Sequence, residues 1–220
     1  MIQNMTGLLL RKLRLDKKSF ITDNDLKEYC KIFELDYTYI TNYYLRKGVF
    51  LRIFRGVFYV KSAEEIEMQL TNYNHMELVS RGLEMKGVMN WYFGLHTALR
   101  LNEMTHEYFT SEDVISGTIF RMNPVTTAGH KFRFTKLSPR LTSFGINMKK
   151  TAIKSTYMRY SDPEKTILDF IYLWRYEGLL PSRIKMQIRD WSIDLNSSKL
   201  EKYAQNYPKT VRNIVLEEFR

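Results

Sequence analysis

The chain has 220 residues, of which 44% are hydrophobic and 26% charged, so it is long enough for two small packed domains. Its net charge of +10 favours polyanionic partners such as nucleic acid, anionic lipid or an acidic protein. The single cysteine excludes an internal disulfide and a multi-cysteine zinc site. No apolar stretch approaches the roughly 20 residues that span a bilayer. We therefore expect a cytoplasmic protein without a membrane segment.

The N-terminal segment, residues 1–62, is predicted to hold three helices and a hairpin. Apolar spacing predicts a first helix from about Asn4 to Leu15 and a second one that begins after the N-cap residue Thr22. A third helix is expected from about Thr38 to Lys47. Two β-rich runs then follow, joined by an Arg-Gly pair. This order is typical of a winged helix-turn-helix that binds double-stranded DNA.

The charge pattern of this segment supports DNA binding. No Asp or Glu occurs between Tyr37 and Ala63, and phosphates repel carboxylates. Asn42 can pair with adenine, Arg46 with guanine or phosphate, and the basic hairpin with phosphates. The alternative for each residue is a solvated polar side chain on an ordinary helix. The predicted DNA-binding residues are Thr38, Tyr39, Thr41, Asn42, Arg46, Lys47, Arg52 and Arg55.

The remainder, residues 63–220, is expected to form a second domain. An acidic linker and a helix precede Gly87, and Trp91–Leu101 reads as another helix. Tyr108–Arg159 is rich in β-branched and aromatic residues and predicts several antiparallel strands. Helices then follow Asp162. The predicted fold class is α+β, with an N-terminal winged helix-turn-helix and a C-terminal domain that combines an antiparallel sheet with several helices.

A second basic region lies in this C-terminal domain. No carboxylate occurs between Val114 and Ser161. Strand alternation predicts Lys131 and Arg133 on one face, with Phe132 and Phe134 on the other. The basic face could bind an acidic protein, RNA or flanking DNA, or it could be only a solvated sheet face. The residues predicted for it are Arg121, Lys131, Arg133, Lys136, Arg140, Lys149, Lys150 and Lys154.

Catalytic signatures are weak throughout the sequence. There is no glycine-rich phosphate loop and no Gly-x-Ser-x-Gly nucleophile elbow. His96, Glu103 and His106 could share a helical face, but structural zinc sites usually need four ligands, commonly thiolates. Asp23 and Asp25 fit the start of a helix better than a catalytic pair. We therefore expect neither enzyme activity nor a bound metal or cofactor.

Three segments carry motifs that point to one family. The run LRKGVFLRIFRGVFYV joins a basic helix end to a basic strand and an Arg-Gly-Val turn. The segments YFGLHTALRLNEM and YSDPEKTILDFIYL follow in the second domain. In order and spacing they resemble AbiEi-type antitoxins of abortive-infection, type IV toxin–antitoxin systems. The matching residues are Lys47, Gly48, Arg52, Arg55, Gly56, Val57, Phe58, Pro163, Glu164, Lys165, Leu168 and Asp169.

The resemblance implies a protein with two roles. Its winged helix would bind inverted repeats in its own promoter as a repressor, and its C-terminal domain would counteract a nucleotidyltransferase-type toxin. The chain lacks a nucleotidyltransferase signature, so it resembles the antitoxin and not the toxin. The alternative is a stand-alone transcription factor whose C-terminal domain binds a ligand or a protein. A monomer or weak dimer, with cooperative binding to paired DNA sites, is compatible with either reading.

Overall fold

The computed structural model describes residues 2–192 and 194–219, and its described part forms two compact units. Met1, Ile193 and Arg220, which belong to the predicted domains, lie outside the described residues. Unit 1 contains the chain up to Gly87 together with Thr127–Gly129 and Thr151–Thr156. Unit 2 contains Val88–Thr126, His130–Lys150 and the chain from Tyr157 onward. The structural division therefore falls at Gly87, whereas the sequence placed a domain boundary at Ser62.

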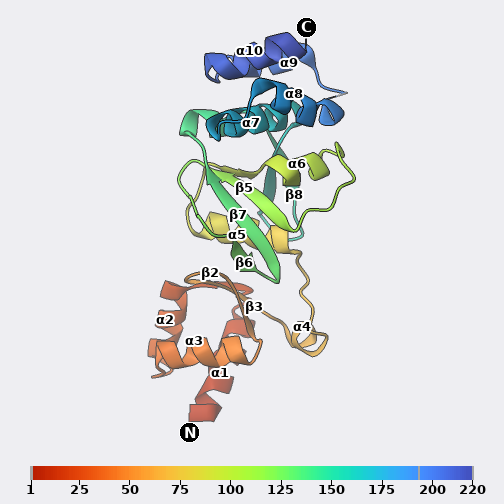
Figure 1. The fold of residues 1–220 in the computed structure, drawn as a ribbon. Helices are drawn as coiled ribbons and strands as arrows, with labels where there is room; N and C mark the ends of the chain where they lie inside the picture. The colour runs from red at the N-terminus through yellow and green to blue at the C-terminus, as the bar shows by residue number, and fades with distance from the viewer. Residues whose placement is uncertain (1, 193, 220) are drawn as a thin grey trace. The chain divides into compact units, whose positions relative to one another are not determined.

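Unit 1 combines helices with a small antiparallel sheet (Figure 1), whose strand order is β1-β3-β2. Its elements in chain order are α1 (Ile2–Leu15), β1 (Phe20–Thr22), α2 (Asp23–Ile32), α3 (Tyr37–Arg46), β2 (Phe50–Phe54), β3 (Val57–Val60), α4 (Ala63–Glu67) and α5 (His75–Met85). The three predicted helices and the hairpin are confirmed as elements. The short strand β1 was not predicted, because three residues give too little periodicity to detect.

Local capping explains where the helices of unit 1 begin. The side chain of Thr22 accepts a hydrogen bond from the backbone of Asp25, whose carboxylate in turn accepts one from the backbone of Thr22. These bonds satisfy backbone donors that a helix start leaves free. The carboxylate of Asp36 accepts a bond of 2.6 Å from the backbone N–H of Tyr39 and so fixes the start of α3.

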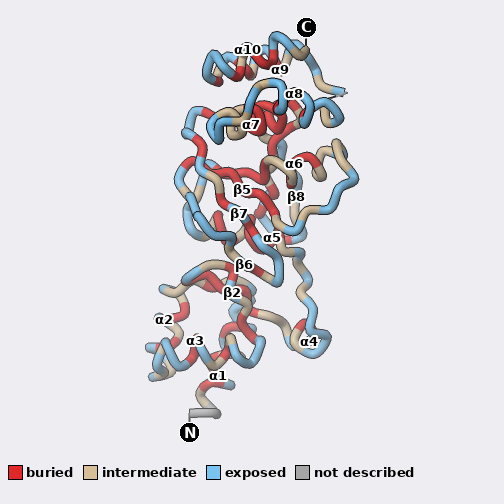
Figure 2. Tube along the Cα trace, viewed as in Figure 1, coloured by how far each residue is buried: buried red, intermediate tan, exposed pale blue. Residues whose placement is uncertain are grey.

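Both faces of the small sheet carry buried side chains, and many residues of its strands are coloured as buried in Figure 2. On one face, Phe50 and Phe58 pack with apolar residues of α1, α2 and α3. On the other face, Ile53, Val57 and Tyr59 pack with Leu78 of α5. This second face explains why the segment after Ser62 belongs to unit 1, since without α5 the strands would expose apolar side chains.

Glycine allows α5 to approach the sheet closely. A Cβ atom built on Gly82 would lie 2.6 Å from the Cγ2 atom of Ile53, which is too close for any larger residue. Two further segments complete unit 1 through hydrogen bonds. The hydroxyl of Thr127 donates to the carbonyl of Ile53 at 2.8 Å, and the backbone N–H of Ala152 donates to the carboxylate of Glu77 at 2.8 Å.

A buried carboxylate fixes α4 to the sheet of unit 1. Glu65 accepts hydrogen bonds from the hydroxyl of Tyr59 at 2.6 Å and from the backbone N–H groups of Ser62 at 2.8 Å and Asn72 at 2.7 Å. Burial alone would raise the pKa of Glu65, but these hydrogen bonds outweigh it and hold the pKa below its ordinary value of 4.5.

This lowered pKa predicts an acid-sensitive unit 1. Because the folded pKa of Glu65 lies below the unfolded one, its contribution to stability is present above about pH 4.5 and is lost as the pH falls through the folded value. Urea unfolding followed by circular dichroism between pH 6 and pH 3 will measure this, and Glu65→Gln is expected to flatten the profile. Glu67→Gln, on an exposed residue of the same helix, is the matched control. Equal profiles for the two variants would contradict the prediction.

Unit 2 contains a six-stranded sheet covered by helices. Its elements are β4 (Trp91–Phe93), α6 (Leu95–Leu101), β5 (Ser111–Ser116), β6 (Val125–Thr127), β7 (His130–Lys136), η1 (Pro139–Thr142), β8 (Ile146–Lys150), β9 (Tyr157–Ser161), α7 (Pro163–Tyr176), α8 (Pro181–Ile188), η2 (Arg189–Trp191), α9 (Ser197–Ala204) and α10 (Lys209–Glu218). Most of β6 belongs to this unit, and its last residue is counted with unit 1.

The strand order of this sheet is β6-β7-β5-β4-β9-β8. β4 pairs with β5 and β8 with β9 in antiparallel fashion, whereas β5 pairs with β7 and β4 with β9 in parallel. The sheet is therefore mixed, so the predicted purely antiparallel arrangement is wrong. The prediction of a helix over Trp91–Leu101 is wrong in its first turn, because Trp91–Phe93 forms the strand β4 and only the remainder is helical.

The main core of unit 2 is built from side chains of this sheet and of the helices α6 to α10, which are layered on it (Figures 1 and 2). Tyr92 and Ile115 of the sheet pack there against Ile167 and Ile171 of α7. The side chain of Asp162 caps α7 by accepting a hydrogen bond from the backbone of Lys165. Among the described residues, no helix is long and apolar enough to cross a bilayer.

A fully buried lysine joins three parts of this core. Lys165 donates hydrogen bonds to the carboxylate of Asp169 and to the hydroxyls of Tyr92, at 2.9 Å, and Tyr207, at 2.8 Å. Both tyrosines donate to Asp169, at 2.6 and 2.7 Å. Burial lowers the pKa of Lys165 and raises the pKa values of both tyrosines. The four groups thus tie α7 to β4 and to the segment before α10.

Candidate nucleic-acid interface

The outer side of α3 presents a row of polar and basic side chains. Thr38, Tyr39, Asn42 and Arg46 are all exposed, and Tyr39 is 46% exposed although it is aromatic. We call these four residues the α3 face. Asn42 lies three residues after Tyr39 and four after Thr38, and Arg46 lies four residues after Asn42, which places the four side chains on one side of the helix. The ring of Tyr39 stacks on that of Tyr43 with centroids 6.0 Å apart, so the exposed ring has a preferred orientation.

One predicted DNA-binding residue does not lie on this face. Thr41 is only 6% exposed, and its hydroxyl donates a hydrogen bond of 2.8 Å to the carbonyl of Tyr37. It lies one turn after Tyr37 and beside Ile40 on the side of α3 that packs into unit 1. Its assignment to a DNA-binding surface is therefore wrong, because neither its hydroxyl nor its methyl group is accessible.

Three further predicted residues are exposed beside the end of α3 and on the hairpin. Lys47 is the C-cap residue of α3. Arg52 lies on β2 with its guanidinium 5.8 Å from the ring centroid of Phe58, which limits its orientations. Arg55 occupies the β2–β3 turn next to Gly56, whose φ of +76° favours glycine. All three cations remain open to solvent.

Asp23 connects the helices to the hairpin. Its backbone N–H donates to the carbonyl of Gly56 at 3.0 Å, and its carboxylate accepts a hydrogen bond from the hydroxyl of Tyr37. A Cβ atom on Gly56 would lie 2.4 Å from the Asp23 carboxylate. Asp23 thus holds the start of α3 and the β2–β3 turn in fixed relation to α2. The sequence identified Asp23 only as part of a helix start, since its partners are distant in the chain.

The second basic region does not form one surface. Lys131, Arg133 and Lys136 lie on β7, whereas Lys149 and Lys150 lie on β8. The strands β5, β4 and β9 separate β7 from β8, which amounts to about 19 Å at ~4.8 Å per strand. The prediction of one continuous basic face is therefore wrong, because strand order in the sheet does not follow sequence order. The alternation predicted within β7 is confirmed, with Phe132 and Phe134 buried and Lys131 and Arg133 exposed.

Two of the predicted cations already have hydrogen-bond partners within the protein. The guanidinium of Arg133 donates to both carboxylate oxygens of Asp113, at 2.8 and 3.2 Å. Arg140 donates to the backbone carbonyl of Asn206. Of the other predicted residues, Lys154 belongs to unit 1, and Arg121 is exposed in the segment before β6. Arg133 and Arg140 are therefore held by partners within the protein, whereas Lys149 and Lys150 are exposed on β8.

The histidine considered as a metal ligand has other partners. The Nδ1 atom of His96 lies 3.1 Å from a carboxylate oxygen of Asp113, and its ring packs against Phe109 and Phe170. In residues 2–192 and 194–219, no group of three His, Cys, Asp or Glu side chains is arranged to hold a metal ion. The spacing of His96, Glu103 and His106 therefore brings no metal site together.

No protein-family model matches the chain, and no curated protein has a matching sequence. Among solved structures, the chain is similar to the crystal structure of the RV2827C protein from Mycobacterium tuberculosis, with a TM-score of 0.57 and 10% sequence identity. The similarity covers 98% of this chain and 76% of that one. At this identity it concerns the fold alone, and it extends over nearly the whole chain.

Proposed function

We propose that unit 1 is a winged helix-turn-helix that binds double-stranded DNA in a sequence-specific manner. The α3 face enters the major groove, where Asn42 and Arg46 contact base edges, and the β2–β3 hairpin contacts the phosphate backbone through Arg52 and Arg55. The protein then acts as a transcriptional repressor of its own operon and as the antitoxin that counteracts a nucleotidyltransferase-type toxin.

The observation that carries this proposal is the α3 face itself, followed directly by a hairpin on which the two basic side chains, Arg52 and Arg55, are exposed. A helix pair, a third helix and a β-hairpin succeed one another, and the hairpin pairs with the strand before α2. This is the element order expected for a winged helix. The two flanking carboxylates, Asp23 and Asp36, keep their charge but are held at the start of the helices by hydrogen bonds from the hydroxyl of Tyr37 and the backbone of Tyr39.

The antitoxin role is supported by the motif resemblance and not by a visible toxin-binding site. The Pro-Glu-Lys-x-x-Leu-Asp segment supplies the start and the buried side of α7, where Lys165, Leu168 and Asp169 are inaccessible. The buried residues of that segment therefore support the fold of unit 2. Co-expression with the product of a neighbouring toxin-like gene tests this role directly, and growth should be restored only when this protein is present.

DNA binding is tested by replacing the two central cations. Arg46→Ala combined with Arg55→Ala is expected to lower the affinity for DNA from upstream of the gene by about 10- to 100-fold at physiological salt, given ~1–3 kcal/mol for a base-contacting arginine. The slope of log affinity against log salt should also become shallower by about 1 for each lost phosphate contact. Electrophoretic mobility shifts at several salt concentrations measure both quantities.

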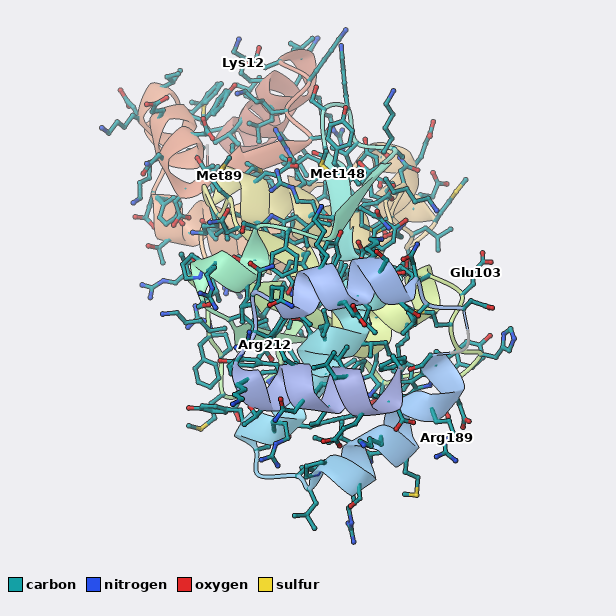
Figure 3. All side chains as sticks on the ribbon, turned by 90° about the horizontal axis from the view of Figure 1, so that it is seen from above. Lys12, Met89, Glu103, Met148, Arg189 and Arg212 are labelled. Carbon is teal, nitrogen blue, oxygen red and sulfur yellow. The ribbon has the colours of Figure 1, made fainter. Side chains whose placement is uncertain are left out.

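A second double variant controls for the loss of net charge. Arg183 and Arg189 are exposed residues of unit 2, and Arg189 is labelled in Figure 3. Arg183→Ala with Arg189→Ala removes the same two charges and should leave specific binding unchanged. If both double variants lose affinity equally, or if neither does, the assignment of the α3 face and the hairpin is wrong.

A further inference from the structure

The strand β8 forms one edge of the six-stranded sheet and is paired on one side only. It pairs with β9 over its full length, and within the described residues no strand pairs with its other side. We call this outward side of Ile146–Lys150 the β8 edge. Four of its five residues, from Asn147 to Lys150, are exposed. The opposite edge strand, β6, has only three residues, so β8 is the longer of the two edges.

The direction of the backbone groups on β8 follows from the bonds that flank it. The backbone N–H of Asp162 donates to the carbonyl of Gly145 at 2.9 Å, and that of Thr151 donates to the carbonyl of Thr156 at 3.3 Å. In an antiparallel pair, hydrogen-bonded and non-hydrogen-bonded residue pairs alternate. Asn147 and Lys149 therefore direct their backbone groups toward β9. Ile146, Met148 and Lys150 direct theirs outward, away from the sheet.

The side chains of the β8 edge set the charge of its ligand. Neither β8 nor β9 contains a carboxylate, and Lys149 and Lys150 are exposed on opposite faces of the sheet. Met148, labelled in Figure 3, is 65% exposed and shares its face with Lys150. The edge thus offers a cation on each face and one apolar side chain, in a region of the sequence without acids.

We propose that the β8 edge binds an extended acidic segment of a partner protein, which adds to the sheet as a further strand. The outward backbone groups of Met148 and Lys150 would pair with the segment, as in other cases of β-strand addition. Carboxylates of two consecutive residues would face Lys149 and Lys150, and an apolar residue would lie beside Met148. For an antiparallel segment this gives the order acidic, acidic, apolar.

The same charges disfavour a second copy of this chain as the occupant. Two β8 strands paired side by side would bring four lysines together, and like charges on neighbouring strands are destabilising. An acidic strand turns this repulsion into attraction. The inference concerns unit 2 and does not depend on the proposed binding of DNA by unit 1.

The test uses the full-length protein and a synthetic probe, the fluorescein-labelled peptide Thr-Glu-Glu-Val-Thr-Val. Fluorescence anisotropy measures its affinity, and the peptide Thr-Lys-Lys-Val-Thr-Val is the charge control. Lys149→Glu combined with Lys150→Glu is expected to weaken binding of the acidic peptide by about tenfold or more, from two cross-strand charge pairs that become repulsive. The same variant should gain affinity for the basic peptide, which a merely unfolded protein would not do.

A second pair of variants tests the backbone pairing. Met148→Pro removes an outward N–H donor and keeps the bonds to β9, a substitution that edge strands tolerate. It should weaken binding of the acidic peptide by about fivefold or more, for the loss of a backbone hydrogen bond worth ~1 kcal/mol. Met148→Ala is the control for the lost side chain, and it should retain the part of the peptide affinity that comes from backbone hydrogen bonds. If Met148→Pro is unstable, an acidic peptide with N-methyl groups on alternate amides removes the same bonds from the other side.

Several outcomes would overturn the proposal. One is the absence of any binding by the acidic peptide. Another is full binding by both Met148→Pro and the N-methylated peptides, which would mean charge attraction without strand pairing. A loss of DNA affinity in the Lys149→Glu, Lys150→Glu variant would assign this edge to nucleic acid. Self-association in analytical ultracentrifugation that Met148→Pro abolishes would assign it to a second copy.

Discussion

Replacing Lys165 by methionine is expected to lower the free energy of unfolding of unit 2 by about 3–5 kcal/mol, the usual cost of breaking a buried ion pair. The lysine is completely buried, and its three hydrogen-bond partners are Asp169, Tyr92 and Tyr207. Without it, the Asp169 carboxylate remains in the core with only two tyrosine hydroxyls to compensate its charge. Tryptophan fluorescence during urea unfolding reports this loss directly, since all three tryptophans lie in unit 2.

The matched double variant separates a lost ion pair from lost packing. Lys165→Met with Asp169→Leu removes both charges and fills the space with apolar groups, which is often neutral or stabilising in other proteins. We expect the double variant to recover most of the stability that the single variant loses. A single variant within about 1 kcal/mol of the parent protein would show that the core tolerates an unpaired Asp169, contrary to this account.

A chain that ends at Ser62 is expected to lose the folded state of its small sheet. Ile53, Val57 and Tyr59 would lose α5 as their cover, at roughly 1.5–3 kcal/mol for each side chain, or about 5–9 kcal/mol in all. That loss equals a large part of the 5–15 kcal/mol by which proteins are typically stable. Circular dichroism and the binding of a hydrophobic dye measure the outcome.

A chain that ends at Gly87 is the control for this truncation. It retains α4 and α5, including Glu65 with its hydrogen bonds to Tyr59 and Ser62, and should keep its secondary structure with little dye binding. If the shorter fragment folds as well as the longer one, the second face of the sheet contributes little to stability. The sequence-based boundary at Ser62 would then describe an independent domain after all.

The sequence predicted local structure well because the signals for it are local. Thr22 and Asp162 each accept a hydrogen bond from the backbone N–H three residues later, so their capping motifs can be read within a single turn. The alternation of Phe132 and Phe134 with exposed cations is likewise a property of one strand. Strand order depends on contacts between residues far apart in the chain, so the separation of β7 from β8 could not be read from the sequence.

The candidate site was predictable to a similar extent. The sequence allowed a helix without acidic residues and with a polar side to be recognised. It did not show which residues of that helix face the core. Thr41 was placed on the wrong side because its polarity outweighed its position one turn after Tyr37. The role of Asp23 depends on Tyr37 and Gly56, which approach it only after folding. The sequence showed that Lys165 and Asp169 are four residues apart, but not that both side chains are buried.

The composition of unit 1 has a consequence for how such proteins can change over time. Unit 1 includes the two later segments Thr127–Gly129 and Thr151–Thr156. The chain therefore leaves unit 1 after Gly87, returns to it for each of these two segments, and leaves it again after each. No single point in the gene therefore separates one unit from the other. A single crossover at Gly87 would take Ile53 and Glu77 from one parent chain and Thr127 and Ala152 from another, and so would put the hydrogen bonds of Thr127 to Ile53 and of Ala152 to Glu77 at risk. We expect the two units to be inherited together and to diversify by substitution within the whole chain, not by exchange of parts.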